Sequence, residues 1–578
     1  MAKKSYGPPA PNQEESNDEI LLSNKPVPDE HLDSTGNEKY KQIFSKLQGN
    51  ILKGHGRDVS ANIFVRFTCS KGDIVSWLSD QAKTITSAAK QLQESNYFKR
   101  FGIPGALFKN IYLTSNFYEL INISDYKHAF DDPKEGTQPF FPQNANFLGG
   151  MLAAAEDFAD DLKVIQDRIT SGEAEPLEIA YLQGDIHALI LLADDGETYL
   201  QRSVREFITE FEEGTNRFPP LGQVLAVELG KALRNQEGEG IEHFGYVDGR
   251  SQPLFLESDF KPLKFLESGQ IDLIQSKEKI NEKAIRKESG DMNVWNPFAK
   301  LEQVLIKDKL AKHPFAYGSY FVFRKLEQDV MRFSMEEQNL ADALNLIGQD
   351  RERAGAMAVG RFRDGTPLTL SETDGLIPAK ANNFRYDGLD ASLETGGQVD
   401  DKIGLKCPFH AHIRKTNPRQ ADPPLGGSVD DQDTGDRNRR IVRRGIPFGD
   451  RIKAPNAFQA LDDLPSRGVG LLFGCFQSSI TKQFAFMQKA WVNGDDFRSP
   501  KVGIDPLIGQ HAGKTIDQSW RKSFGVDTSS AEPDQPFPNS HPVKFSFKDF
   551  IKFRGGEFFF APSIEFFNSL PRLTGITI

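Results

Sequence analysis

Four short apolar segments, separated by long stretches of helical periodicity, constrain the fold of this chain more than any other feature. They are residues 63–67, 185–193, 317–326 and 468–477, and their continuous apolar or β-branched character is typical of buried strands. Apolar residues recur at helical spacing in residues 74–92, 146–167, 204–214, 328–347 and 479–492. Long helices mixed with well-separated strands predict an α+β fold rather than a sandwich or a helical bundle.

Polar segments divide the chain into parts. Residues 1–38 are rich in Pro, Asn and Glu, and we expect a disordered tail because they cannot bury enough apolar surface to fold alone. Helical spacing in residues 39–47 marks the start of the folded part. Residues 268–312 are rich in Lys and Glu and predict an exposed insertion, whereas residues 420–440 predict a long loop that is a lid or is disordered.

Charge and cysteine content narrow the class of protein. The 578 residues suggest two or more domains, and their formal net charge of −11 argues against a nucleic-acid partner. The three cysteines, Cys69, Cys407 and Cys475, form no CxxC pair and no zinc spacing, which fits a reducing compartment. With no secretory signal and no apolar stretch long enough to span a membrane, we expect a cytoplasmic protein with no membrane partner. The chain is expected to be a monomer or a homodimer.

Two histidines stand in an unusual context. His410 and His412 lie in CPFHAHIRKTNPR, residues 407–419, and would share one face if this stretch were extended. A neutral imidazole can bind the iron of a haem, and the neighbouring cations could meet its propionates. A basic surface loop, or an anion site without metal, fits these residues as well.

Two further segments carry charged residues beside glycines. Asp248 lies between two glycines in FGYVDGRSQP, which suggests a turn where the backbone approaches another group closely. Arg443 and Arg444 precede Gly445 in RRIVRRGIPFGD. Taken singly, an ordinary Asp-Gly turn and a solvated basic run explain both segments.

Six segments in a fixed order nevertheless resemble the dye-decolorising peroxidase family, from about residue 47 to residue 562. They are LQGNILKGHGRD (47–58), the GxxDG element (245–249), AHIRKTNPR (411–419), RGIPFG (444–449), GLLFGCFQSSI with QFAFMQKAW (470–491) and GGEFFFAPS (555–563). The resemblance implies two ferredoxin-like halves, with haem b held mainly by the C-terminal half. It divides the chain into residues 39–267, which carry the distal carboxylate, the insertion 268–312, and residues 313–578.

The resemblance also implies roles for residues on the side of the haem where peroxide binds. Asp248 matches the distal carboxylate, and Arg443 matches the distal arginine, with Arg444 as the second choice. Leu471 and Phe473 match the pair of apolar side chains over the haem.

On the other side of the haem, His412 matches the proximal iron ligand. Asp505 matches a carboxylate that hydrogen-bonds the other ring nitrogen of His412, which would raise the basicity of this ligand. Arg414 is expected among the cations that meet the haem propionates.

The implied activity is that of a haem peroxidase that reduces hydrogen peroxide through an oxo-ferryl intermediate and oxidises dyes, phenolics or other bulky donors. An acidic optimum is expected, because the unperturbed pKa of Asp is about 3.9. Phe448 stands where some relatives carry a tyrosine used for surface oxidation, so Trp491 is an alternative relay, although a packed core indole explains it equally well. A haem carrier, an iron-release enzyme or a haem-free scaffold remain alternatives, because a fold does not determine a function.

Overall fold

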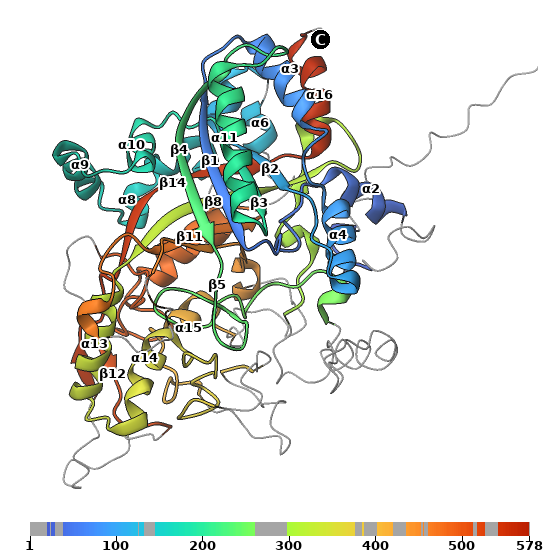
Figure 1. Cartoon of the computed structure of the whole chain (residues 1–578). Helices are drawn as coiled ribbons and strands as arrows, with labels where there is room; N and C mark the ends of the chain where they lie inside the picture. The colour runs from blue at the N-terminus through green and yellow to red at the C-terminus, as the bar shows by residue number, and fades with distance from the viewer. Residues whose placement is uncertain are drawn as a thin grey trace, which may run out of the picture.

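The structure is a computed structural model (Figure 1). It describes residues 20–23, 25–28, 38–124, 126–131, 145–260, 297–375, 384–386, 401–419, 435–451, 453, 455, 460–511, 517–525 and 542–576. None of the helices within these ranges combines the length and the apolar character needed to cross a membrane.

A ten-stranded antiparallel sheet forms the centre of the molecule, in the order β10-β11-β8-β14-β2-β3-β1-β4, with β7 paired to β8 and β9 paired to β11. Its first four strands along the chain are β1 (Val59–Phe67), β2 (Phe108–Leu113), β3 (Ala188–Asp194) and β4 (Gly222–Lys231). The others are β7 (Ile306–Lys307), β8 (Tyr317–Gln328), β9 (Val442–Arg443), β10 (Ile446–Phe448), β11 (Gly470–Gln477) and β14 (Ile551–Ala561). Two small sheets pair β5 (Leu233–Arg234) with β6 (Gly240–Ile241) and β12 (Gln518–Trp520) with β13 (Val543–Phe545).

The N-terminal half of the sheet is ferredoxin-like. Its order is β4-β1-β3-β2, with α3 (Lys71–Gln81) and α4 (Ala88–Phe101) after the first strand and α11 (Glu197–Glu213) after the third. Shorter helices connect β2 to β3, namely α5 (Ser115–Leu120), α6 (Tyr126–Asp131), α7 (Ala145–Ala153), α8 (Ala155–Phe158), α9 (Leu162–Ser171) and α10 (Pro176–Gln183). Figure 1 shows α11 lying along β1 and β4, and α3 beside the C-terminal helix α16 (Ile564–Thr574).

The C-terminal half repeats the same strand order. β10, β11, β8 and β14 lie side by side, and a single residue pair between Phe560 and Leu113 joins this half to the first. Between β8 and β9 the chain forms α13 (Val330–Ala343), α14 (Glu352–Val359) and the short α15 (His412–Thr416). Two π-helical segments, Thr481–Ala485 and Met487–Val492, follow β11. The predicted α+β class with two ferredoxin-like halves is therefore confirmed.

The large sheet encloses a common core. Every strand from β10 to β4 in the order given above contributes buried or packed side chains to one apolar cluster. The two ends of the sheet meet, since β10 packs against β4 and the Ile446 side chain lies beside Gly230. Lys325 of β8 also reaches β4, where its Nζ lies 2.5 Å from Glu228 Oε2. The sheet thus curves around its core rather than lying open.

Helix boundaries follow local capping more than apolar periodicity. Residues 74–92 were predicted as one helix, but Ser70 and Ser87 each accept a backbone N–H three residues later, and each begins a separate helix. Gly102 ends α4 with a φ of 68°, a conformation that glycine adopts without strain.

Two predicted polar segments are partly built into the fold. Val27, which belongs to the expected tail, is buried against the folded part of the chain, and its N–H donates to the carbonyl of Phe255. At the end of the expected insertion, Leu301 and Val304 are buried and β7 pairs with β8. The exposed-insertion prediction is therefore wrong for residues 297–312, while residues 268–296 lie outside the described residues.

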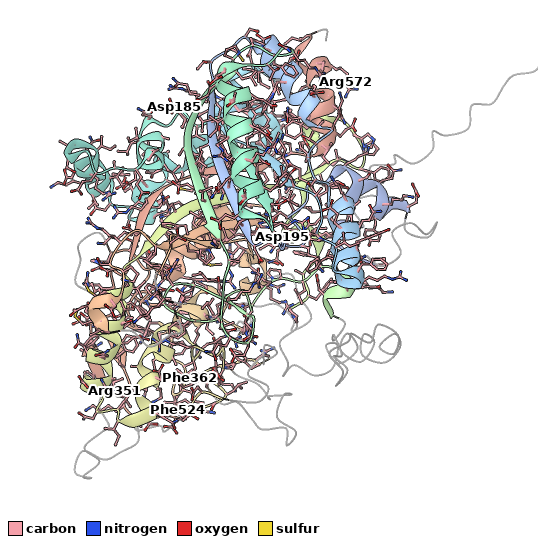
Figure 2. The ribbon with its side chains drawn as sticks, in the orientation of Figure 1. Asp185, Asp195, Arg351, Phe362, Phe524 and Arg572 are labelled. Carbon is pink, nitrogen blue, oxygen red and sulfur yellow. The ribbon has the colours of Figure 1, made fainter. Side chains whose placement is uncertain are left out.

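A separate lobe surrounds α13 and α14. Its own apolar cluster includes Phe362, with Phe524 packed against it, and Figure 2 shows both at the end of the molecule opposite Arg572 of α16. In Figure 1, α15 lies between this lobe and the sheet. The candidate site lies at this junction.

Candidate active site

The sheet supplies an apolar wall to a cavity at this junction. Leu471 and Phe473 of β11 stand in register with Leu326 and Arg324 of β8, and all four line the cavity. Leu472, between the two β11 residues, points instead into the core of the sheet. The structure therefore brings the predicted pair, Leu471 and Phe473, to one wall.

The predicted carboxylate and arginine meet on the same cavity. Arg443 of β9 pairs across the strands with Cys475, and its Nη1 donates to Asp248 Oδ1 at 2.7 Å. Gly249, with a φ of 79°, turns its own N–H onto the same oxygen at 2.6 Å. About a third of each side chain remains open, 36% for Asp248 and 31% for Arg443, so a small molecule can reach both.

This arrangement keeps Asp248 ionised. Burial alone would raise the pKa of its carboxyl, but the charge of Arg443 and the N–H of Gly249 outweigh that effect. The pKa of Asp248 consequently lies below its ordinary value. The ionised carboxylate can accept a proton, and the guanidinium beside it can stabilise a developing negative charge at the same place.

Arg444 has a different role from its neighbour. Its Nε donates to the Asn50 carbonyl at 2.6 Å and its Nη2 to the Ile51 carbonyl at 3.0 Å. Of these two arginines, Arg443 lines the cavity, whereas Arg444 connects the end of β9 to the LQGNILKG segment.

His412 begins α15 and also lines the cavity. Its Nδ1 lies 2.8 Å from Asp505 Oδ2, which leaves Nε2 as the ring nitrogen that can bind a metal. Asp505 is held by the backbone N–H groups of Leu507 and Ile508 at 2.8 and 3.0 Å. The contact with His412 and these hydrogen bonds lower the pKa of Asp505 against the opposing effect of its burial.

His410 does not share a face with His412, contrary to the extended arrangement considered from the sequence. The chain turns into a helix at His412, and the His410 ring packs on Trp520 with centroids 4.4 Å apart. Burial lowers the pKa of His410 to about 3, so it is a neutral core residue.

Arg414 does not line the cavity either. Its guanidinium binds Asp401 at 3.0 Å and stacks over Tyr386 at 4.2 Å, because the helical turn points it away from the face that carries His412. Among the other buried arginines that line the cavity are Arg361 and Arg419. Burial lowers the pKa of Arg361 to about 9, with a contribution from the charge of Arg419, and burial lowers that of Arg419 to about 10.

These features fit a haem. A flat apolar macrocycle suits the wall of leucine and phenylalanine side chains, and one imidazole nitrogen is available as an axial ligand. Two buried guanidiniums that repel each other would be stabilised by an anionic group between them, and the haem propionates are such groups. Among the described residues, no group of three or more His, Cys, Asp and Glu side chains could hold a bare metal ion.

Sequence reasoning missed most of the polar residues of this cavity, among them Glu242, Arg324, Gln328 and Arg361. Arg324 and Gln328 lie on one face of β8, but the sequence does not single them out, because Lys325 and Glu327 of the same strand are charged as well. Arg324 is buried against Asp160, with its Nη1 3.0 Å from Asp160 Oδ2. Nothing in the sequence marks Glu242 either.

Comparison with known proteins identifies the family. The profile of the family described as "Dyp-type peroxidase, C-terminal" matches residues 288–500. The multifunctional dye peroxidase DyP2 of Amycolatopsis sp. is 36% identical over 533 residues, which cover 91% of this chain and 96% of that protein. A dye-decolorizing peroxidase of the fungus Mycetinis scorodonius is 29% identical over 84% of this chain and 86% of its own length.

Solved structures agree with these sequence matches. The crystal structure of a DyP-type peroxidase from Anabaena sp. superposes with a TM-score of 0.72 at 32% identity, covering 96% of this chain and 99% of that one. The structure of DyP2 from Amycolatopsis sp. gives a TM-score of 0.72 at 33% identity, covering 94% and 99%. The chain therefore belongs to the dye-decolorising peroxidases and is a haem-dependent peroxidase.

Proposed function

We propose that this peroxidase binds haem b through His412 and uses Asp248 and Arg443 to process hydrogen peroxide. One observation carries the proposal: the Arg443–Asp248 pair lines the same cavity as His412, whose Nδ1 is held by Asp505. Arg361 and Arg419 would hold the propionates, and Leu471 and Phe473 would cover the macrocycle.

The bound haem would supply the redox chemistry, because iron and macrocycle together can give two electrons to peroxide and recover them one at a time from donors. Asp248 would accept a proton at its carboxylate from one oxygen of hydrogen peroxide and return it to the other oxygen, which leaves as water. The guanidinium of Arg443 would stabilise the negative charge that develops as the O–O bond breaks. The second oxygen leaves as water after two protons and two donor electrons are taken up.

Dyes and phenolics are the proposed donors, and the larger ones would react at the surface. Trp491 is partly exposed in a shallow groove, while its neighbour Val492 lines the haem cavity. The Trp491 ring packs edge-on against Phe486 and Phe497, at 5.5 and 5.9 Å between centroids. Phe448 is buried and has no phenol, so Trp491 is the better candidate for an electron relay.

An absorption spectrum of the haem-loaded protein, before and after one equivalent of hydrogen peroxide, tests this proposal. We expect a ferric Soret band that changes within the mixing time and recovers when a dye is added. His412→Ala should lose or alter the ferric spectrum, and an unchanged spectrum would show that His412 is not the ligand. A Soret band that ignores peroxide would instead favour a haem carrier.

A further inference from the structure

Glu242 is a half-buried carboxylate that lines the same cavity as Asp248 and has no role in the proposed chemistry. It follows β6 and begins the tight loop that leads to Asp248. The loop closes on itself, because Gly245 N–H donates to the Glu242 carbonyl and Asp248 N–H donates to the Gly240 carbonyl at 3.0 Å.

The carboxylate of Glu242 holds this loop from inside with both oxygens. Its Oε2 accepts the N–H of Phe244 at 2.8 Å, and its Oε1 accepts the N–H of Tyr246 at 3.0 Å. Two of the residues between Glu242 and Asp248 are thus attached to one side chain. A carboxylate has only acceptors, so it can satisfy both donors at once.

The same carboxylate attaches the loop to the cavity wall. Gln328 of β8 donates its Nε2 to Glu242 Oε2 at 2.5 Å. β8 is the strand that carries Leu326 and Arg324 beside Leu471 and Phe473. Glu242 therefore connects the backbone before Asp248 to the sheet that forms the wall of the cavity.

We propose that Glu242 is a positioning residue for the peroxide reaction, and that it fixes Asp248 relative to the cavity wall through Phe244, Tyr246 and Gln328. This inference rests on the proposed role of Asp248. Misplacement of a catalytic group by about 1 Å can cost on the order of a hundredfold in rate, so a loop held at three points has a direct catalytic consequence.

The charges around Glu242 are few. Asp248 on the same loop disfavours its ionisation, and Arg451 from the segment after β10 lies within electrostatic range. Gln328 is neutral, and His243 is neutral because burial lowers its pKa to about 4. Burial raises the pKa of Glu242 to about 7, so it is largely uncharged at the acidic pH at which Asp248 remains ionised. Two carboxyl groups in one cavity with separated pKa values can hold different protonation states.

Glu557 offers a matched control. It is more deeply buried than Glu242, but its pKa is also raised to about 7 by burial, it also accepts two backbone N–H groups, and it does not line the cavity. Both of its donors, Met151 N–H at 2.7 Å and Phe558 N–H at 2.8 Å, bind the single oxygen Oε1. Glu557→Gln can keep both bonds, whereas Glu242→Gln must turn an amide NH2 toward a backbone N–H.

The test measures the second-order rate constant for hydrogen peroxide, as a function of pH, in the haem-loaded protein. We expect Glu242→Gln to lower it by roughly ten- to a hundredfold with an unchanged ferric spectrum, and to change its pH profile. Glu557→Gln should stay near the wild-type rate. Gln328→Met, which removes only the hydrogen bond between β8 and Glu242, should fold readily and lower the rate by a few-fold.

A double variant shows whether Glu242 acts through Asp248. In an Asp248→Asn background, Glu242→Gln should have no further effect on the rate. A further tenfold loss there, or a single variant within twofold of wild type, would overturn the inference. If Asp248→Asn itself keeps the wild-type rate, the proposed role of Asp248 fails, and with it any need to position that residue.

Amide hydrogen exchange gives a readout that does not depend on turnover. Glu242→Gln should speed exchange at Phe244 and Tyr246, whose N–H groups lose their fixed acceptor, and leave α11 of the N-terminal half unchanged. Unchanged protection at both amides would also contradict the proposed attachment.

Discussion

Arg443 and Arg444 are neighbours in the chain and meet different parts of the molecule. Arg443 faces the cavity and Asp248, while Arg444 binds two backbone carbonyls of the segment around Asn50. The cause is the alternation of side chains along an extended strand. One basic dipeptide therefore supplies a catalytic candidate and a structural tie.

Replacing each arginine should separate these roles. Arg443→Leu should lower the rate constant for peroxide by about 10²- to 10³-fold, because it removes the group that stabilises the developing charge, with little change in Tm. Arg444→Leu should lower the free energy of unfolding by about 2 kcal/mol and leave the peroxide rate near wild type. Stopped-flow kinetics and thermal unfolding measure both, and the reverse pattern would exchange the assignments.

The acid limit of the reaction should report the ionisation of Asp248. Since its pKa lies below the ordinary value, loss of the charge on Asp248 should lower the peroxide rate constant only below about pH 4. Arg443→Leu removes the charge that lowers this pKa, so the falling limb should move to higher pH. A falling limb that keeps its position in Arg443→Leu would contradict Asp248 as the group involved.

The sequence was most informative for residues whose position follows from a short motif. His412, Asp248, Arg443, Leu471 and Phe473 line one cavity in the structure, as the motifs led us to expect. The orientation of Arg414 could not be predicted, because it depends on a single helical turn that begins at His412. The position of Glu242 depends on contacts with β8, a distant part of the chain.

At the level of elements, strands with continuous apolar character were predictable and half-polar strands were not. β3 and β8 lie where apolar runs were found, whereas β4 has alternating burial and was not predicted. The segment 479–492 was predicted as an ordinary helix but forms two π-helical turns. Apolar spacing does not distinguish the two helix types, because both bury one side.

In the second π-helical segment, Trp491 lies in a surface groove and the next residue, Val492, lines the cavity. Trp491→Phe should lower the turnover of bulky dyes by roughly tenfold or more, because benzene rings do not lose electrons readily, and should leave the rate with hydrogen peroxide unchanged. Steady-state rates with a large anthraquinone dye and with a small phenol compare the two routes. Equal losses with both donors would indicate that Trp491 only packs the segment.

Across the whole molecule, buried carboxyl groups tie stability to pH. The pKa values of Glu242 and Glu557 are raised to about 7 by burial, so these two groups bind more protons in the folded state than in the unfolded state between about pH 4.5 and pH 7. Stability from these groups is therefore complete at low pH and is lost as pH rises through 7. The α+β class could be predicted from the sequence. The burial that raises the pKa values of these two glutamates could not, because it depends on contacts that form only in the assembled sheet.

Glu557→Gln tests this linkage without touching the cavity. At pH 4.5 the variant and the wild type should unfold at similar temperatures, because Glu557 is neutral there. At pH 8 the variant should be more stable by up to about 3 kcal/mol, the value of a shift of this size. Thermal unfolding of both proteins between pH 4.5 and pH 8 tests this prediction. A difference in stability that does not change with pH would contradict the raised pKa of Glu557.

The meeting of β10 with β4 has a consequence for how the molecule behaves among its own copies. An open sheet presents unpaired backbone groups at its outer strands, where another chain can add a strand and start aggregation. Here the Ile446 side chain covers Gly230, and a Cβ at that glycine would come within 2.4 Å of it. Within the part of the chain that the structure describes, the outer strands of the large sheet shield each other, and self-association by strand addition is disfavoured.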